Sequence, residues 1–122
     1  MDLTLEALAL YRKTAIHRQE QWQSERLGLQ EEAWVAARRA ADLLREKFGV
    51  TRVVVFGSLV HPGCFTRWSD IDLAAWGIAL DDTLCAIGAV MDLETPYEIN
   101  LVDIQTARPA ILKVIEQEGV EI

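Results

Sequence analysis

The longest uniform stretch of the chain lies at its start and constrains the fold most. Residues 3–48 contain no proline and are rich in Ala, Leu, Glu, Gln and Arg, all of which form helices readily. Apolar residues recur at steps of three and four, as one face of a helix requires: Trp34, Ala37, Ala41 and Leu44. Gly49 supplies a C-terminal cap, whereas Gly28 costs a helix about 1 kcal/mol. The pattern predicts one long N-terminal helix, or a helix pair divided at Gly28.

The rest of the chain alternates between two apolar patterns. β-Branched or alternating segments predict strands at 52–56, 69–76 and 97–104, with a short edge strand at 120–122. Helical spacing predicts helices at 81–93 and 109–118. In the first of these two helices, the residues with helical apolar spacing are Leu84, Ile87, Val90 and Met91. The alternation indicates the α/β (α+β) class, with a helical segment 1–49 and a domain 50–122 in one globular unit.

Composition and charge exclude several classes of function. The 122 residues suit one domain, and 51% hydrophobic with 25% charged residues is typical of a soluble globular protein. Residues 1–49 carry eight basic and eight acidic side chains, whereas residues 50–122 carry four basic and eleven acidic ones. This acidity argues against direct DNA binding and is compatible with divalent cations. Without a membrane-spanning run or a signal-peptide pattern, we expect a cytoplasmic protein with reduced cysteines and no membrane partner.

The residues with chemical potential flank the first two predicted strands. The segment Phe56-Gly57-Ser58 ends the first strand, and after eleven further residues Asp70-Ile71-Asp72 begins the second. Gly57 lets the backbone approach a ligand, and Ser58 with nearby N–H groups can hold phosphate oxygens. Asp70 and Asp72 point to the same side of a strand, where their mutual repulsion favours a cation such as Mg²⁺ between them. The arrangement predicts a site for Mg²⁺ and a nucleoside triphosphate.

These two segments resemble a known family. Val54-Val55-Phe56-Gly57-Ser58, followed by Ser69-Asp70-Ile71-Asp72-Leu73, is similar to the signature of the polymerase β-like nucleotidyltransferases, and in particular of their minimal branch. The resemblance covers roughly residues 48–122. It implies a palm domain, with a small mixed sheet and helices on one face, preceded here by a long helix or helix pair. It also implies that Gly57 and Ser58 bind the triphosphate, and that Asp70 and Asp72 bind the metal and are catalytic.

The family resemblance further implies an activity and a partner. Such enzymes transfer a nucleoside monophosphate, here most simply AMP from ATP, to a hydroxyl and release pyrophosphate. Many minimal members act as antitoxins that adenylylate a tyrosine on a partner of the higher-eukaryote-and-prokaryote nucleotide-binding (HEPN) family. We therefore expect Mg²⁺-dependent adenylyl transfer to a protein hydroxyl, with a HEPN-type toxin as partner. A homo-oligomer that completes a small, open palm is a further expectation.

The chain departs from the family pattern at the third carboxylate. The matching position is Asn100, which can coordinate weakly through its carbonyl but cannot take a proton. Glu98 lies two residues earlier on the same predicted strand face and is a candidate replacement, whereas Asp103 has the opposite parity. We therefore include Glu98 and Asn100 among the catalytic candidates. The substitution favours an alternative in which the domain binds and neutralises its partner by contact, through the polar helical segment Arg12–Arg26.

Other candidates carry weaker signals. Arg67 could neutralise phosphate near the site, so we add it to the nucleotide-binding candidates. Trp68 or Trp76 could stack on a base, although a tryptophan beside apolar strand residues usually lies in the core. His61 is expected to be an exposed loop histidine. A third possibility, transfer to a small molecule such as an aminoglycoside, fits less well, because those enzymes usually add a helical domain for the acceptor.

Overall fold

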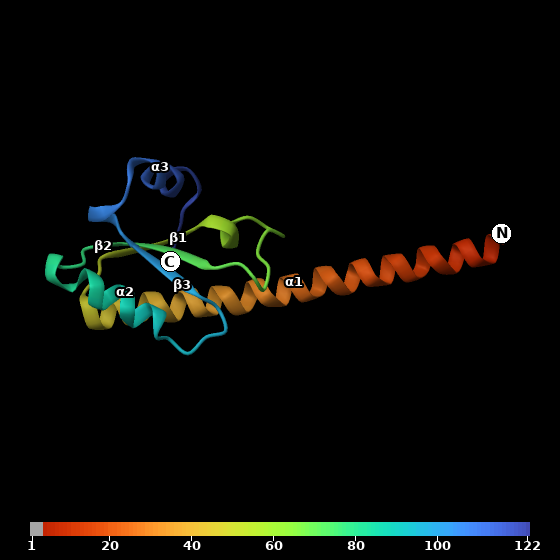
Figure 1. The fold of residues 1–122 in the computed structure, drawn as a ribbon, viewed down its shortest axis with the longest axis horizontal. Coiled ribbons are helices and arrows are strands. Elements are labelled where there is room, and N and C mark those ends of the chain that lie inside the picture. The colour runs from red at the N-terminus through yellow and green to blue at the C-terminus, as the bar shows by residue number, and fades with distance from the viewer. Residues whose placement is uncertain (1–3) are drawn as a thin grey trace.

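The computed structural model describes residues 4–122, which form a four-stranded sheet with helices around it (Figure 1). The longer elements, in chain order, are α1 (Leu5–Phe48), β1 (Arg52–Phe56), β2 (Ile71–Trp76), α2 (Thr83–Met91), β3 (Ile99–Asp103), α3 (Pro109–Glu118) and β4 (Val120–Glu121). Short 3-10 turns cover Gly57–Val60, Leu80–Asp82 and Ile104–Thr106. The predicted elements are confirmed, but β2 and β3 are shorter than predicted, and Asp70 and Glu98 each lie just before a strand.

The sheet is mixed, as predicted. Its strand order is β3-β2-β1-β4, with β1 antiparallel to both β2 and β4, and β2 parallel to β3. The register places Phe56 opposite Asp72 and Asp72 opposite Asn100. The C-terminal end of β1 therefore lies beside the N-terminal ends of β2 and β3, and the residues predicted to carry chemistry meet at this end of the sheet.

The N-terminal helix α1 is continuous. Thr4 caps its first turn by accepting a hydrogen bond from the Ala7 N–H, and Gly49 ends it in the left-handed conformation with φ 64°. The helix continues through Gly28, so of the two predicted alternatives the single long helix is correct and the pair divided at Gly28 is not. Every residue from Thr4 to Glu25 is exposed, and this half of α1 extends away from the rest of the protein (Figure 1).

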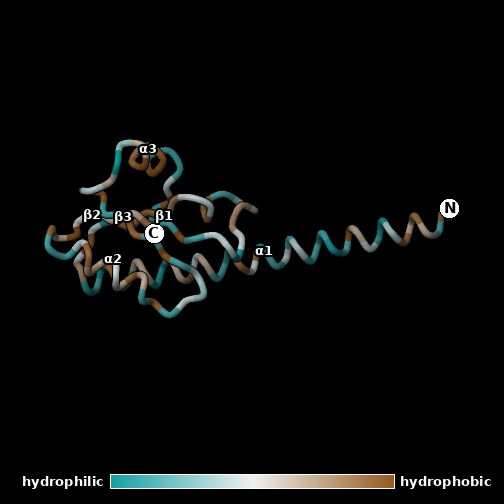
Figure 2. Tube along the Cα trace, viewed as in Figure 1, coloured by the Kyte–Doolittle hydropathy of each residue, from teal (hydrophilic) through white to brown (hydrophobic). Residues whose placement is uncertain are grey.

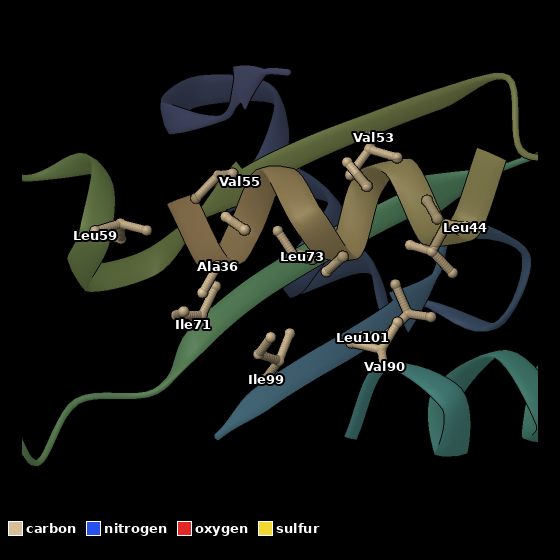
Figure 3. Packing of buried hydrophobic residues seen from close by; sticks show 14 of the residues in the cluster. Ala36, Leu44, Val53, Val55, Leu59, Ile71, Leu73, Val90, Ile99 and Leu101 are labelled. Carbon is tan, nitrogen blue, oxygen red and sulfur yellow. The ribbon is translucent and has the colours of Figure 1, made fainter. Parts of the chain in front are cut away.

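Two apolar clusters lie on opposite faces of the sheet. The larger one joins the second half of α1, α2 and the strand residues that point toward them, including Val53, Val55, Leu73 and Ile99 (Figure 3). The smaller one consists of Val54, Phe56, Ala74 and Ile115, and lies under α3. Figure 2 shows the apolar α3 on one side of the sheet and α1 and α2 on the other. The expected fold class is confirmed, but the expectation that the helices lie on one face is wrong: α1 and α2 share a face, whereas α3 covers the other.

The apolar spacing in α2 identifies only part of its packed side. Val90 is buried and Ile87 packs against the core, but Leu84 is 82% and Met91 56% exposed, and Ala86 is buried in addition. The Thr83 hydroxyl donates a hydrogen bond of 2.7 Å to the buried Asp103 carboxylate, and this contact holds that side of α2 against β3. Trp68, expected in the core, is 84% exposed on the loop before β2. Within residues 4–122, no helix combines the length and apolarity required to cross a membrane.

Candidate functional site

The site lies where β1 ends and β2 and β3 begin. Asp72 is the second residue of β2 and is half-buried, and Asp70 precedes the strand and is exposed. Both belong to the sheet face that carries α3, because their neighbour Ile71 is fully buried on the opposite face. Asn100, the second residue of β3, lies directly across from Asp72. Three of the predicted site residues are thus brought together by strand pairing alone.

Gly57 follows the last residue of β1 and lies against the Asp72 carboxylate. Its φ of 80° is a left-handed conformation that side chains rarely adopt, and it turns the chain into the 3-10 turn Gly57–Val60. A Cβ at this position would collide with Asp72 Oδ2 and lie 3.4 Å from Asp72 Cγ. Ser58 follows in the same turn and is half-buried. The glycine therefore serves two purposes, since it permits both the turn and the close approach of the Asp72 carboxylate.

Asn100 links the two aspartates. Its side-chain amide lies 3.5 Å from Asp70 Oδ2 and 3.4 Å from Asp72 Oδ1, so that Nδ2 can donate to both carboxylates over long, weak hydrogen bonds. The sequence marked Asn100 as a missing acid and did not indicate this bridging role. The parallel register of β2 and β3, which pairs Asp72 with Asn100, is the signal that could have found it.

The electrostatics of the site favour a positive ligand. Burial raises the pKa of Asp72 above its ordinary value, the hydrogen bond from Asn100 lowers it, and the neighbouring charge of Asp70 raises it. The net effect is a raised pKa, so the ionised form of Asp72 is less favourable in the folded protein than it would be in water. A divalent cation between the two carboxylates would reverse this direction, because it stabilises both negative charges.

Comparisons with known proteins support the fold. No protein-family model matches this sequence, and no curated protein matches it. Chains in crystal structures of the MntA-HpeT toxin-antitoxin are similar in structure. The chain in one mutant is 20% identical, with a TM-score of 0.59 over 70% of each chain. A toxin-antitoxin solved with AMP-PNP is 18% identical, with a TM-score of 0.57 over 70% of each chain. The chain therefore shares the fold of the matched chains in these toxin-antitoxin crystal structures.

The mutant with a TM-score of 0.59 carries glutamate in place of two aspartates. A second mutant, with a tyrosine replaced by alanine, is 20% identical and has a TM-score of 0.56 over 70% of this chain and 69% of that chain.

The remaining acidic candidates do not join the two aspartates. Within residues 4–122, no three His, Cys, Asp or Glu side chains gather closely enough to hold a metal ion. Glu98 is exposed, and its backbone carbonyl accepts a hydrogen bond of 2.9 Å from the Ile71 N–H. Asp103 is buried on the opposite face of the sheet, as its parity predicted. The roles of Glu98 and Asn100 in catalysis remain predictions.

The loop from His61 to Asp70 borders the site and is held by its own hydroxyl groups. Ser69 Oγ accepts a hydrogen bond of 3.0 Å from the Thr66 N–H and lies 3.2 Å from Thr66 Oγ1. Sequence analysis missed this pair, although a Thr-x-x-Ser spacing is typical of such turns. Arg67 is exposed, with its guanidinium 5.4 Å from the ring centre of Trp68. His61 is exposed as expected, and its Nε2 lies 3.0 Å from Glu118 Oε2.

Proposed function

We propose that this protein is a Mg²⁺-dependent nucleotidyltransferase that transfers AMP from ATP to a protein hydroxyl, as the antitoxin of a two-protein system. The observation that carries the proposal is the meeting of Gly57 with the Asp72 carboxylate, where a side chain would collide. A turn that brings backbone against a paired carboxylate suits a triphosphate held together with its metal. The MntA-like fold and the toxin-antitoxin structure with AMP-PNP support the same function.

The residues of the site fit Mg²⁺. This ion prefers carboxylate oxygens and takes one or two of them, with substrate phosphates and water completing its shell. Asp70 and Asp72, two residues apart, supply such oxygens; burial, and to a smaller extent the charge of Asp70, raise the pKa of Asp72, and a cation held there would counter both effects. Bound there, the ion would neutralise charge on the triphosphate and on the developing transition state.

The protein residues then have distinct tasks. Gly57 and Ser58 place backbone N–H groups and a hydroxyl at the turn, where they can hold phosphate oxygens. The acceptor oxygen attacks the α-phosphorus, and the bond from this phosphorus to the α,β-bridging oxygen breaks, so that pyrophosphate leaves with the electron pair. The hydroxyl proton passes to water, because Asn100 cannot accept it and the exposed Glu98 does not join the two aspartates. Asn100 keeps Asp70 and Asp72 in place through its amide.

A second function is favoured by Asn100 itself. Without a third carboxylate beside Asp70 and Asp72, the domain could retain nucleotide binding and neutralise its partner by contact alone. The exposed half of α1 would then supply the recognition surface. The two functions differ in one observable: only the enzyme attaches a nucleotide to its partner.

A transfer assay tests the choice directly. The protein is incubated with α-labelled ATP, Mg²⁺ and the protein encoded beside it as acceptor. We expect label on the acceptor with the wild type, and none with Asp70→Asn or Asp72→Asn, which keep the size of each side chain. Binding without label would support the contact antitoxin. In that case Asn100→Asp should restore transfer if the rest of the site is competent.

A further inference from the structure

The exposed half of α1 continues the stripe by which this helix packs on the sheet. Leu8, Ala15, Trp22, Leu29 and Ala36 recur every seven residues along one side of the helix. Ala36 is buried in the main core and Leu29 packs against it, whereas Leu8 and Trp22 are 37% and 58% exposed. A seven-residue repeat is typical of helices that pack against another helix. The stripe is therefore covered by the sheet at one end and uncovered at the other.

Three hollows follow this side of α1 in a continuous line, which we call the docking track. The first lies between Ala7 and Arg18, and the second between Arg18 and Arg26. The third, of about 590 Å³, lies between α1 and the loop before β2, and includes Trp22, Arg26, Arg67 and Trp68. Arg18 is shared by the first two hollows, and Trp22 and Arg26 by the last two.

The docking track ends at the loop that leads into the candidate site. Trp68 forms part of its last hollow and is only two residues from Asp70, which limits their Cα separation to about 7 Å. Arg26 ties α1 to this loop, because its Nη1 donates a hydrogen bond of 3.3 Å to the Gly63 carbonyl. A partner lying along the track would therefore reach the loop that leads into the paired aspartates.

The side chains of the docking track belong to types that dominate binding energy at protein interfaces. Tyr11, Trp22 and Trp68 are 73%, 58% and 84% exposed, and Arg26 stacks on Trp22 with its guanidinium 3.8 Å from the ring centre. Tryptophan, tyrosine and arginine are enriched at interface hot spots. Exposed aromatic residues in a continuous line indicate a protein-binding surface.

The charge of the track selects the partner. Its first two hollows contain Arg18 and Arg26 and no acidic residue, although the whole protein carries a net charge of −7. The third hollow contains both Arg26 and Arg67 and the acidic Glu25 and Glu32, so the positive part of the track is the segment from Arg18 to Arg26. A second copy would place the same arginines opposite each other and would add the repulsion of two acidic proteins. An acidic helix instead offers carboxylates to these arginines.

We propose that the docking track binds an amphipathic helix of the acceptor protein, with apolar residues against Tyr11 and Trp22 and acidic residues against Arg18 and Arg26. The bound helix brings the acceptor hydroxyl toward the loop before Asp70. Binding of an acidic helix follows from the track alone, whereas its identity as part of the acceptor rests on the proposed function.

Matched variants on the two sides of α1 test the binding. Trp22→Ala and Arg18→Glu alter the track, whereas Leu27→Ala and Lys13→Glu make the same changes five residues away, about 140° around the helix. All four positions are exposed, so we expect no change in fold by circular dichroism. The probes are the protein encoded beside this one and two synthetic amphipathic helices with the same leucine stripe, flanked by glutamates or by lysines.

We expect each track variant to weaken binding of the neighbouring protein and of the glutamate-flanked helix about ten-fold in calorimetry, and each control under about two-fold. The lysine-flanked helix should not bind. Equal binding of both helices, binding of neither, or equal effects of Arg18→Glu and Lys13→Glu would overturn the proposal. So would light scattering that shows a dimer lost on Trp22→Ala, which would assign the track to a second copy.

The transfer assay separates this proposal from the proposed function. If Arg18→Glu raises the KM for the acceptor about ten-fold and leaves kcat unchanged, both hold, because the track contributes binding and not chemistry. Transfer with an unchanged KM would overturn the docking track and leave the nucleotidyltransferase standing. If the wild type binds through the track but transfers no nucleotide, the docking track stands and the nucleotidyltransferase proposal is overturned.

Discussion

At the scale of single residues, the site depends on one contact between a glycine and a carboxylate. Gly57 has the backbone conformation that turns the chain out of β1, and it leaves no room for a side chain beside Asp72. Gly63, in the next loop, has nearly the same φ, 78° against 80°, but nothing lies within 4 Å of a Cβ there. The two glycines separate the cost of the conformation from the cost of the contact.

Alanine at each position should distinguish these costs. Gly63→Ala should lower the free energy of unfolding by about 1 to 2 kcal/mol, because only the left-handed backbone conformation is unfavourable for alanine there. Gly57→Ala carries this cost and also displaces the Asp72 carboxylate, so we expect a larger loss of stability in urea and loss of Mg²⁺–ATP binding by titration calorimetry. If Gly57→Ala bound Mg²⁺–ATP as well as Gly63→Ala does, the contact would have no role in the site.

Asp72 gives a second prediction, which depends on pH. Because its pKa is raised in the folded protein, the stability associated with Asp72 is fully present below its unfolded pKa of about 3.9 and is lost as the pH rises through the folded pKa. Asp72→Asn carries no charge at any pH. In EDTA it should therefore be more stable than the wild type at pH 7 in urea denaturation, and this advantage should disappear below about pH 4.

Two comparisons complete that measurement. Asp81→Asn, at an exposed turn position, should show no such advantage. Adding Mg²⁺ should reduce the difference in unfolding free energy between Asp72→Asn and the wild type at pH 7. The ion stabilises the wild type more, because the variant offers it fewer ligands. A wild type that exceeds Asp72→Asn in stability at pH 7 in EDTA would contradict the direction of the shift.

At the scale of elements, α1 combines two different environments in one helix. Its second half is held by the sheet through Ala33, Ala37, Ala40 and Leu44, all fully buried. Its first half has no such support, so its helical structure depends on backbone hydrogen bonds and on extension from the buried half. The helix continues through Gly28 because the buried half already provides a nucleus, so each further residue only extends an existing helix.

Replacing Gly28 should strengthen the exposed half. A Cβ there meets nothing within 4 Å, and alanine favours a helix over glycine by about 1 kcal/mol. We expect Gly28→Ala to slow amide hydrogen exchange in residues 5–27, with little change in residues 33–44, whose protection comes from packing. Unchanged exchange in the first half would mean that Gly28 does not limit its helicity.

At the scale of the whole molecule, the two faces of the sheet carry acidic residues with different roles. Asp70, Asp72 and Asn100 belong to the face near α3, while Asp103 is buried on the face that carries α2. Asp103 accepts hydrogen bonds from the Thr83 hydroxyl at 2.7 Å and from the Gln105 N–H at 3.1 Å. Its carboxylate thus fixes α2 on β3 and has no contact with the site.

Removing this carboxylate should affect only stability. Asp103→Ala leaves the Thr83 hydroxyl without its acceptor and should cost about 1 to 3 kcal/mol in urea denaturation. Asp103→Asn keeps an acceptor oxygen and should lose less. Binding of Mg²⁺–ATP, measured where both variants remain folded, should equal that of the wild type. Weakened nucleotide binding would instead show that α2 positions the site.

Much of the architecture could be predicted from local pattern alone. Residues 52–56 and 109–118 have the predicted bounds, because a β-branched run and a proline-led helical run each favour one conformation through their own backbone. The candidate site was also local in part, since Gly57-Ser58 and Asp70-Ile71-Asp72 are short segments whose geometry follows from strand alternation. The interpretation of Leu84 rested on its helical spacing and that of Trp68 on its residue type, and neither signal shows which surface the element meets.

The sequence by itself determined the elements, the face on which Asp70 and Asp72 project, and the opposite placement of Asp103, since these follow from backbone preference and from the two-residue period of a strand. Only the tertiary structure decided that Asn100 bridges the two aspartates, that α3 covers the second face of the sheet, and that half of α1 is uncovered. Strand register and helix packing join residues distant in the chain, and the energy of those contacts exists only once the sheet has formed.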